Sequence, residues 1–196
     1  MLQKYSLTTS ALTLALLFSG TVDAEMKPIL TVGLELGGDN LVNTSTYDLK
    51  AGGGISFGAG MSFSQTDSTL SYRIMLHYLF DSVEFTDPNG EASFDTFPLE
   101  LGLFNRWNKH EFGGGLSYHL KPSFEISSNN SFLNGSVDFD NATGLFLQYN
   151  YIFSQSESST YGNDTYVGVK LTSIDYETGN TSIDAGSLGI YLGSRF

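Results

Sequence analysis

The stretch that decides the fold is SLGIYLGSRF, residues 187–196, at the end of the sequence. Its apolar residues Leu188, Ile190 and Leu192 occupy every second position, and Phe196 is the final residue. Alternation of apolar with small or polar residues is typical of a β-strand that has one apolar face. Because the end of a chain is usually polar and poorly ordered, this pattern predicts a closing strand that is held in a sheet.

The same alternation recurs along the rest of the chain. Seven further segments show it, at 27–37, 51–63, 69–80, 95–104, 110–121, 141–153 and 164–174. Strand formers are abundant, with 15 Phe and 11 Tyr, and the 22 Gly suit the bends of a small barrel. Repeated segments of this kind, separated by polar turns, indicate a barrel. We therefore predict an all-β fold, an antiparallel up-and-down transmembrane β-barrel of about eight strands.

The first 24 residues have the organisation of a secretory signal peptide. Lys4 precedes an apolar segment at 11–18, and small residues lead to Ala24, after which we expect cleavage. The apolar segment is shorter than the roughly 18 residues that a transmembrane helix requires. We therefore predict a signal peptide at 1–24, secretion through the inner membrane, and an outer-membrane β-barrel domain at 25–196.

The connections between the expected strands alternate in length. Short turns follow every second strand, whereas long polar stretches follow the others, at 38–50, 81–94, 121–141 and 175–184. Outer-membrane barrels have short periplasmic turns and long extracellular loops. We expect the long stretches to be extracellular loops and both ends of the barrel domain to lie at the periplasmic side.

Alternation alone does not say which face of the barrel is apolar. A secreted lipocalin-like binder would have the same pattern with its apolar row turned inward. Three features indicate that the apolar row contacts lipid and that the polar row faces the lumen. The polar row is rich in Gly, Ser and Thr, the apolar rows hold almost no charge, and tyrosines recur near the ends of the apolar rows. These tyrosines are Tyr72, Tyr78, Tyr118, Tyr149 and Tyr151.

The closing stretch resembles the carboxy-terminal strand of bacterial outer-membrane proteins, which ends in Phe and has alternating apolar residues before it. The matching residues are Leu188, Ile190, Leu192 and Phe196. The wider pattern is similar to the small eight-stranded barrels of the OmpA transmembrane-domain and OmpX kind. The resemblance implies that the barrel-assembly machinery reads these four residues as its signal during biogenesis, and that outer-membrane lipid surrounds the protein.

Charged residues fall in the row that we expect to face the lumen. They are Glu35, Arg73, His77, Glu100, Glu111, His119, Lys170 and Arg195. Buried charges are costly unless they are paired, and this set mixes both signs. We therefore predict a structural ion-pair network in which Arg73 pairs with Glu100 or Glu111. The alternative is a narrow porin-like channel whose charges tune ion selectivity.

A lipid-modifying enzyme of the outer membrane is a further alternative. Its nucleophile and base would be Ser117 with His119, or Ser71 with His77. Both pairs point toward the lumen in the expected register, whereas a site for outer-leaflet lipid should open at the membrane. We therefore assign no catalytic residue, no cofactor and no metal ligand.

The net charge of −12 argues against nucleic-acid binding, which requires a basic surface. Many carboxylates fall in the expected extracellular loops, which suggests divalent cations or other surface ligands as partners. The sequence thus predicts an outer-membrane barrel with a structural or surface-interaction role.

Overall fold

The computed structural model describes residues 24–43, 48–65, 68–86, 89–155 and 164–196. The expected signal peptide lies outside the described residues, apart from Ala24. Eight long strands form the main body: β1 (Ala24–Gly37), β4 (Gly54–Gln65), β5 (Leu70–Thr86), β6 (Asn89–Trp107), β7 (His110–Ser128), β9 (Ala142–Gln155), β10 (Asp164–Ser173) and β13 (Ser187–Arg195). Among the described residues, no helix has the length and apolar character needed to cross a membrane.

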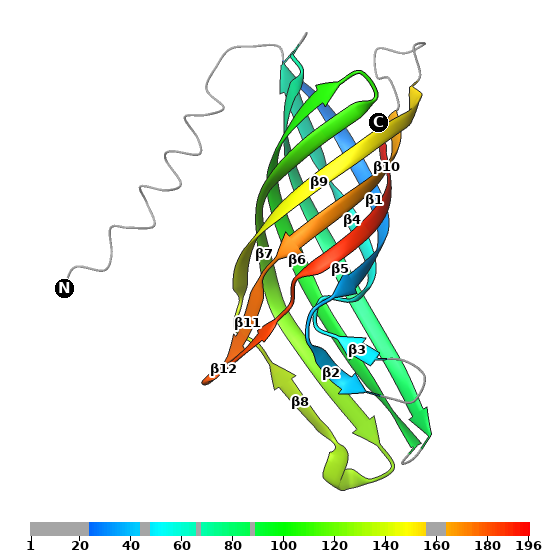
Figure 1. Ribbon diagram of the computed structural model, residues 1–196, viewed down its shortest axis with the longest axis vertical. Helices are drawn as coiled ribbons and strands as arrows, with labels where there is room; N and C mark the ends of the chain where they lie inside the picture. The colour runs from blue at the N-terminus through cyan, green and yellow to red at the C-terminus, as the bar shows by residue number, and fades with distance from the viewer. Residues whose placement is uncertain (1–23, 44–47, 66–67, 87–88, 156–163) are drawn as a thin grey trace, which may run out of the picture.

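Shorter elements extend one end of this body. They are β2 (Asn40–Asn43), β3 (Asp48–Lys50), a 3-10 turn at Ser131–Leu133, β8 (Gly135–Asp138), β11 (Asp175–Thr178) and β12 (Thr181–Asp184). β2 pairs with β3, β11 pairs with β12, and β8 pairs with β7. All of these short strands lie toward the lower end of Figure 1, away from the start of β1 and the end of β13.

The long strands close into a barrel. They follow the order β6-β5-β4-β1-β13-β10-β9-β7, and β6 also pairs with β7. Closure occurs where the first and last strands meet, because Leu34 of β1 pairs with Ile190 of β13 on one side and with Ile55 of β4 on the other. Every described neighbour pair is antiparallel, so the predicted eight-stranded up-and-down barrel is confirmed.

The apolar row faces outward. In β13 the side chains of Leu188, Ile190 and Leu192 are exposed, whereas Tyr191 between them is only 2% exposed. The same alternation of exposed and buried residues runs along β5, from Leu70 toward its end. A surface of exposed leucine, isoleucine and phenylalanine suits lipid contact and not water. The lipocalin-like alternative, which requires an apolar lumen, is therefore wrong.

Three strands run well beyond the apolar band, which corrects the prediction of a long loop at 81–94. β5 continues to Thr86 and β6 begins at Asn89, so this region forms a paired hairpin in which Glu84 lies opposite Glu91. The outward residues turn polar here because they leave the lipid, while the inward residues Val83, Ala92 and Phe94 are apolar, in contrast to the polar lumen. We call the parts of β5, β6 and β7 at 81–86, 89–95 and 123–128, together with β8, the extracellular sheet.

The opposite end of the barrel has short turns. Asn108 and Lys109 alone connect β6 to β7, and Trp107 pairs directly with His110. Asn108 has a φ of 54°, a left-handed conformation that suits a two-residue hairpin turn. The start of β1 and the end of β13 lie at this same rim in Figure 1. By the length rule for outer-membrane barrels, we treat this rim as periplasmic and the other as extracellular.

Candidate functional site

All eight charged residues that the sequence placed in the lumen lie inside the barrel. Each is at most 5% exposed, although they come from six different strands. They reach the interior because each occupies an inward position of its strand. Outward apolar residues lie on both sides of all of them except Glu111 and Arg195, which follow His110 and Ser194. The structure gathers seven of these side chains into two ion-pair clusters, whereas His119 contacts the hydroxyl groups of Ser117 and Tyr176.

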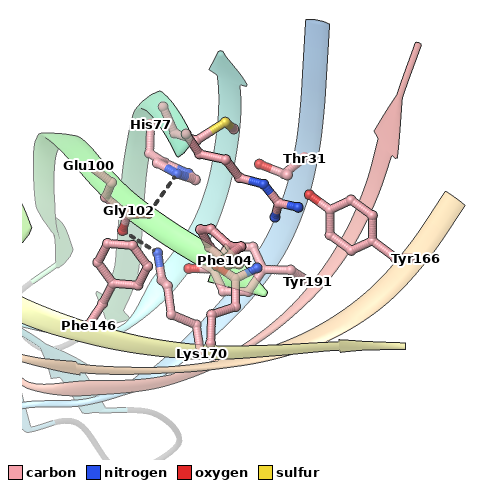
Figure 2. A pocket seen from close by; sticks show the side chains of 12 residues that line it. Thr31, His77, Glu100, Gly102, Phe104, Phe146, Tyr166, Lys170 and Tyr191 are labelled. Carbon is pink, nitrogen blue, oxygen red and sulfur yellow. Dashed lines mark hydrogen bonds and ion pairs between the residues drawn. The ribbon is translucent and has the colours of Figure 1, made fainter. Parts of the chain in front are cut away.

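The central cluster is built around Lys170. Its Nζ lies 2.6 Å from Glu100 Oε1 and 3.8 Å from Glu35 Oε1. The other Glu100 oxygen, Oε2, is 3.2 Å from His77 Nε2. Figure 2 shows Glu100 between His77 and Lys170, with contacts to both. One carboxylate thus connects β5, β6 and β10 across the lumen.

Glu35 is held by two hydroxyl groups of β13. Ser187 Oγ donates a hydrogen bond of 2.6 Å to Oε2, and the Tyr191 hydroxyl donates to Oε1. Lys170 Nζ lies 4.6 Å from the centroid of the Tyr191 ring, close enough for a cation–π interaction. The closing strand therefore supplies lumen contacts as well as lipid-facing leucines.

The second cluster surrounds Glu111. Its Oε1 accepts hydrogen bonds from the Arg73 guanidinium and, at 2.8 Å, from Asn150 Nδ2. Its Oε2 accepts a hydrogen bond of 3.3 Å from Arg195 Nη1. Of the two partners considered for Arg73, the structure selects Glu111. The Arg73 guanidinium also lies 3.9 Å from the centroid of the Phe104 ring.

Sequence reasoning missed two members of this second cluster. Asp164 Oδ2 lies 3.1 Å from Arg195 Nη2 and 2.8 Å from Arg106 Nη1. Asp164 is the first residue of β10 and Arg106 lies next to the end of β6, so both are at strand ends where periodicity is weakest. The alternation of the strands could have identified them, because residues an even number apart in a strand face the same side. Asp164 is an even number of residues from Lys170 on β10, and Arg106 is an even number from Glu100 on β6.

Little empty space remains around these charges. The cavity in the middle of the lumen has a volume of about 20 Å³, which is room for about one water molecule. Figure 2 shows Phe104, Phe146, Tyr166 and Tyr191 filling the space beside the charged groups. Among the described residues, the middle of the barrel is therefore closely packed.

The extracellular end of the lumen is closed by apolar side chains. We call this group the apolar cap, and its buried members are Leu49, Ala51, Val83, Ala92, Phe94, Ile174, Tyr176 and Ala185. The rings of Phe94 and Tyr176 stack at a centroid distance of 5.8 Å. Burial raises the pKa of the Tyr176 hydroxyl, which therefore stays protonated. The cap joins the inner face of the extracellular sheet to the β2–β3 and β11–β12 hairpins.

No protein-family model and no curated protein sequence matches the chain. A solved structure of Ail, the attachment invasion locus protein of Yersinia pestis, in complex with the heparin analogue sucrose octasulfate, matches with a TM-score of 0.53 and 12% identity, over 88% of this chain and 99% of that chain. A second structure of Ail has a TM-score of 0.50 and 11% identity, over 87% of this chain and 97% of that chain. The chain has the fold of the small outer-membrane β-barrels.

The resemblance to the small eight-stranded barrels is thereby confirmed. The Neisserial surface protein A also aligns with this outer-membrane barrel, with a TM-score of 0.49 and 10% identity, over 88% of this chain and 97% of that chain. The fold supports a place in the bacterial outer membrane.

Of the two serine–histidine pairs considered for catalysis, one is within hydrogen-bonding distance in the outer-membrane barrel. Ser117 Oγ lies 3.0 Å from His119 Nε2, and His119 Nδ1 lies 2.6 Å from the Tyr176 hydroxyl. Ser117 is fully buried beneath the apolar cap. His77 instead contacts the hydroxyl of Ser56, at 3.4 Å, and not Ser71. Ser117 and His119 line neither the central cavity nor the cavity at the periplasmic end, whereas His77 lines the first and Ser71 the second.

The outward face of the extracellular sheet is acidic. Glu84 lies directly opposite Glu91, an arrangement that places two like charges side by side. Partial burial and the nearby charge of Glu125 raise the pKa of Asp95. The acidic residues of 81–94 were expected in a solvated loop, but those that the structure describes lie on β5 and β6, while Asp87 lies outside the described residues.

Proposed function

We propose that this outer-membrane barrel is a closed scaffold with a structural or surface-interaction role, and that it is neither a channel nor an enzyme. The observation that carries the proposal is the filling of the lumen. Paired charges occupy its middle, where the cavity measures about 20 Å³, and the apolar cap covers its outer end. A hydrated ion has no route past both layers.

Opening such a route would be energetically costly. It would require separation of Lys170 from Glu100, whose side chains are 3% and 4% exposed, and movement of the apolar cap. Breaking one buried ion pair alone costs about 3–5 kcal/mol. Paired charges at this depth therefore support a plug and count against a selectivity filter, which needs sites that an ion can enter and leave.

Any recognition would then belong to the extracellular sheet and its hairpins. Their outward carboxylates, such as Glu84, Glu91 and Glu125, suit divalent cations or a basic partner surface better than a polyanion like the sucrose octasulfate bound to Ail. A paired sheet loses little conformational entropy on binding, so it presents these charges at low entropic cost.

Biogenesis is part of the same proposal. Residues 1–24 would direct secretion and be removed, and the barrel-assembly machinery would read Leu188, Ile190, Leu192 and Phe196. The three apolar residues face outward, and the Phe196 N–H donates a hydrogen bond of 3.0 Å to the carbonyl of Pro28. The closing strand is thus accessible along one apolar face before lipid covers it.

Single-channel recording tests the proposal. The mature chain, folded into a planar bilayer, should give no discrete current steps above the bare membrane, while a heat-dependent shift in gel migration shows that the barrel has folded. The double variant Lys170→Ser with Glu100→Ser, which removes a balanced pair of charges from the middle, is the matched comparison. Discrete steps from the unmodified chain that change in the double variant would identify the lumen as a conducting path and overturn the proposal.

A further inference from the structure

A second cavity lies at the periplasmic end of the lumen. Its volume is about 310 Å³, comparable with the smaller ligand pockets of proteins at roughly 300 Å³. It is separated from the central cavity by the Glu111 cluster, whose Glu111 and Arg195 form part of its wall. We call this cavity the periplasmic vestibule.

The ion pairs beside the vestibule do not balance. Three guanidinium groups, those of Arg73, Arg106 and Arg195, share the carboxylates of Glu111 and Asp164. The central cluster has the opposite excess, since Lys170 faces both Glu35 and Glu100. The excess charges are therefore separated along the barrel axis, with the positive one in the Glu111 cluster. Arg73 lines the central cavity, however, and the charged residues that line the vestibule itself balance, since Lys27, Arg106 and Arg195 face Glu25, Glu111 and Asp164.

The guanidinium groups also retain unused hydrogen-bonding capacity. Arg195 lines the vestibule and is only 5% exposed, yet among the described residues its Nε has no hydrogen-bond partner and its Nη2 has only the ion-pair contact of 3.1 Å with Asp164 Oδ2. Arg106 Nη2 has no hydrogen-bond partner there either. Buried guanidinium N–H groups without acceptors are unfavourable, so an incoming acceptor would be stabilised at this place.

Hydroxyl groups face the same space. Ser64 of β4 lies directly opposite Ser71 of β5, and Ser62 is on the same inward row of β4. Serine hydroxyls and guanidinium groups are the donors that proteins use for tetrahedral oxyanions. Lys27 also lines the vestibule, where its Nζ pairs with Glu25 at 3.2 Å.

We propose that the periplasmic vestibule binds a tetrahedral oxyanion of the phosphate class, held by Arg106 and Arg195 with help from the serine hydroxyls. The anion neutralises the excess positive charge of the cluster. Free phosphate or a phosphate group on a lipid headgroup could supply this chemistry. The site lies at the opposite end of the molecule from the extracellular sheet and is independent of the proposed surface role.

Binding of inorganic phosphate to the mature chain in maltoside micelles, which contain no phosphate, tests the site. Equilibrium dialysis should show saturable binding of one phosphate per chain, and phosphate should raise the melting temperature more than chloride at equal ionic strength. Arg106→Gln should weaken binding about tenfold through loss of a charged donor. Asp164→Asn, which enlarges the excess positive charge, should tighten it.

Lys109→Gln is the matched control, because Lys109 is exposed on the adjacent turn and does not line the vestibule. Its affinity for phosphate should be unchanged. If phosphate does not saturate, or if Arg106→Gln and Lys109→Gln weaken binding equally, the site does not exist and only diffuse electrostatics remain. Displacement of bound phosphate by phosphatidylglycerol added to the micelles would identify the lipid headgroup as the source of the oxyanion, whereas retention would identify the free ion.

Discussion

Replacement of Glu111 by Gln should be among the most destabilising single changes in the lumen. The Glu111 side chain is 1% exposed and accepts from Arg73, Arg195 and Asn150. The amide keeps the size of the side chain but removes its charge, which leaves two nearly buried guanidinium groups with one fewer carboxylate. Removal of one partner from a buried ion pair costs about 3–5 kcal/mol.

This cost can be measured by urea unfolding of the barrel in lipid vesicles. Trp107 is the one tryptophan in the sequence and is exposed at the periplasmic rim, so its fluorescence reports transfer from the membrane interface to water. The free energy of unfolding extrapolated to zero urea should fall by about 3–5 kcal/mol for Glu111→Gln. Glu84→Gln, at an exposed site opposite Glu91, should change it by less than about 0.5 kcal/mol.

A double variant makes the test specific to charge. Adding Arg73→Gln to Glu111→Gln removes one of the uncompensated guanidinium groups. The double variant should therefore lose about 1–3 kcal/mol less free energy of unfolding than the sum of the losses of the two single variants. A loss below about 1 kcal/mol for Glu111→Gln, or simple additivity with Arg73→Gln, would refute the view that paired charges hold the middle of the barrel together.

Three further predictions test other parts of the molecule, the first with a control substitution. Gly115→Ala should strongly reduce barrel stability in the same assay, because the added methyl group would collide with the backbone of the neighbouring strand, whereas Gly135→Ala meets no atom within 4 Å and should be neutral. Asp95→Asn should stabilise the barrel at neutral pH by less than about 1 kcal/mol. The pKa of Asp95 is raised in the folded barrel, so its ionisation destabilises the fold as pH rises. In acid Asp95 is protonated and the gain from the substitution should vanish. Phe94→Ala should cost about 3–5 kcal/mol within the cap, seen as protease cleavage of the extracellular hairpins while the membrane-spanning barrel remains protected.

The barrel itself is predictable from the sequence because lipid and lumen impose a strict period of two. The closing stretch at 187–196 has apolar residues at alternate positions, and the lumen residues follow because parity fixes the face of every residue in a strand. Glu35, Glu100 and Lys170 could be assigned to the interior in this way. Their pairing could not, because it depends on the stagger between strands that are distant in sequence.

The extracellular sheet was missed because its outward residues contact water. In 81–94 the polar residues outnumber the apolar ones, so the stretch has the composition of a loop. The inward residues Val83, Phe85, Ala92 and Phe94 still alternate with polar residues, and that period was the available signal. The apolar cap was beyond sequence reasoning, since Leu49, Phe94 and Tyr176 meet only through tertiary packing.

Amide hydrogen exchange of the mature barrel in lipid nanodiscs most directly tests whether β-structure continues beyond the membrane and closes over the lumen. Exchange resolved by residue compares the extracellular part of β5 and β6, at 82–86 and 89–94, with the membrane-spanning part at 71–80. The structure predicts slow exchange in both, because Val83 and Ala92 are paired across the hairpin and buried under the cap. Exchange of the extracellular amides at the rate of an unstructured chain would show that this region is a loop, and would contradict a capped and closed barrel.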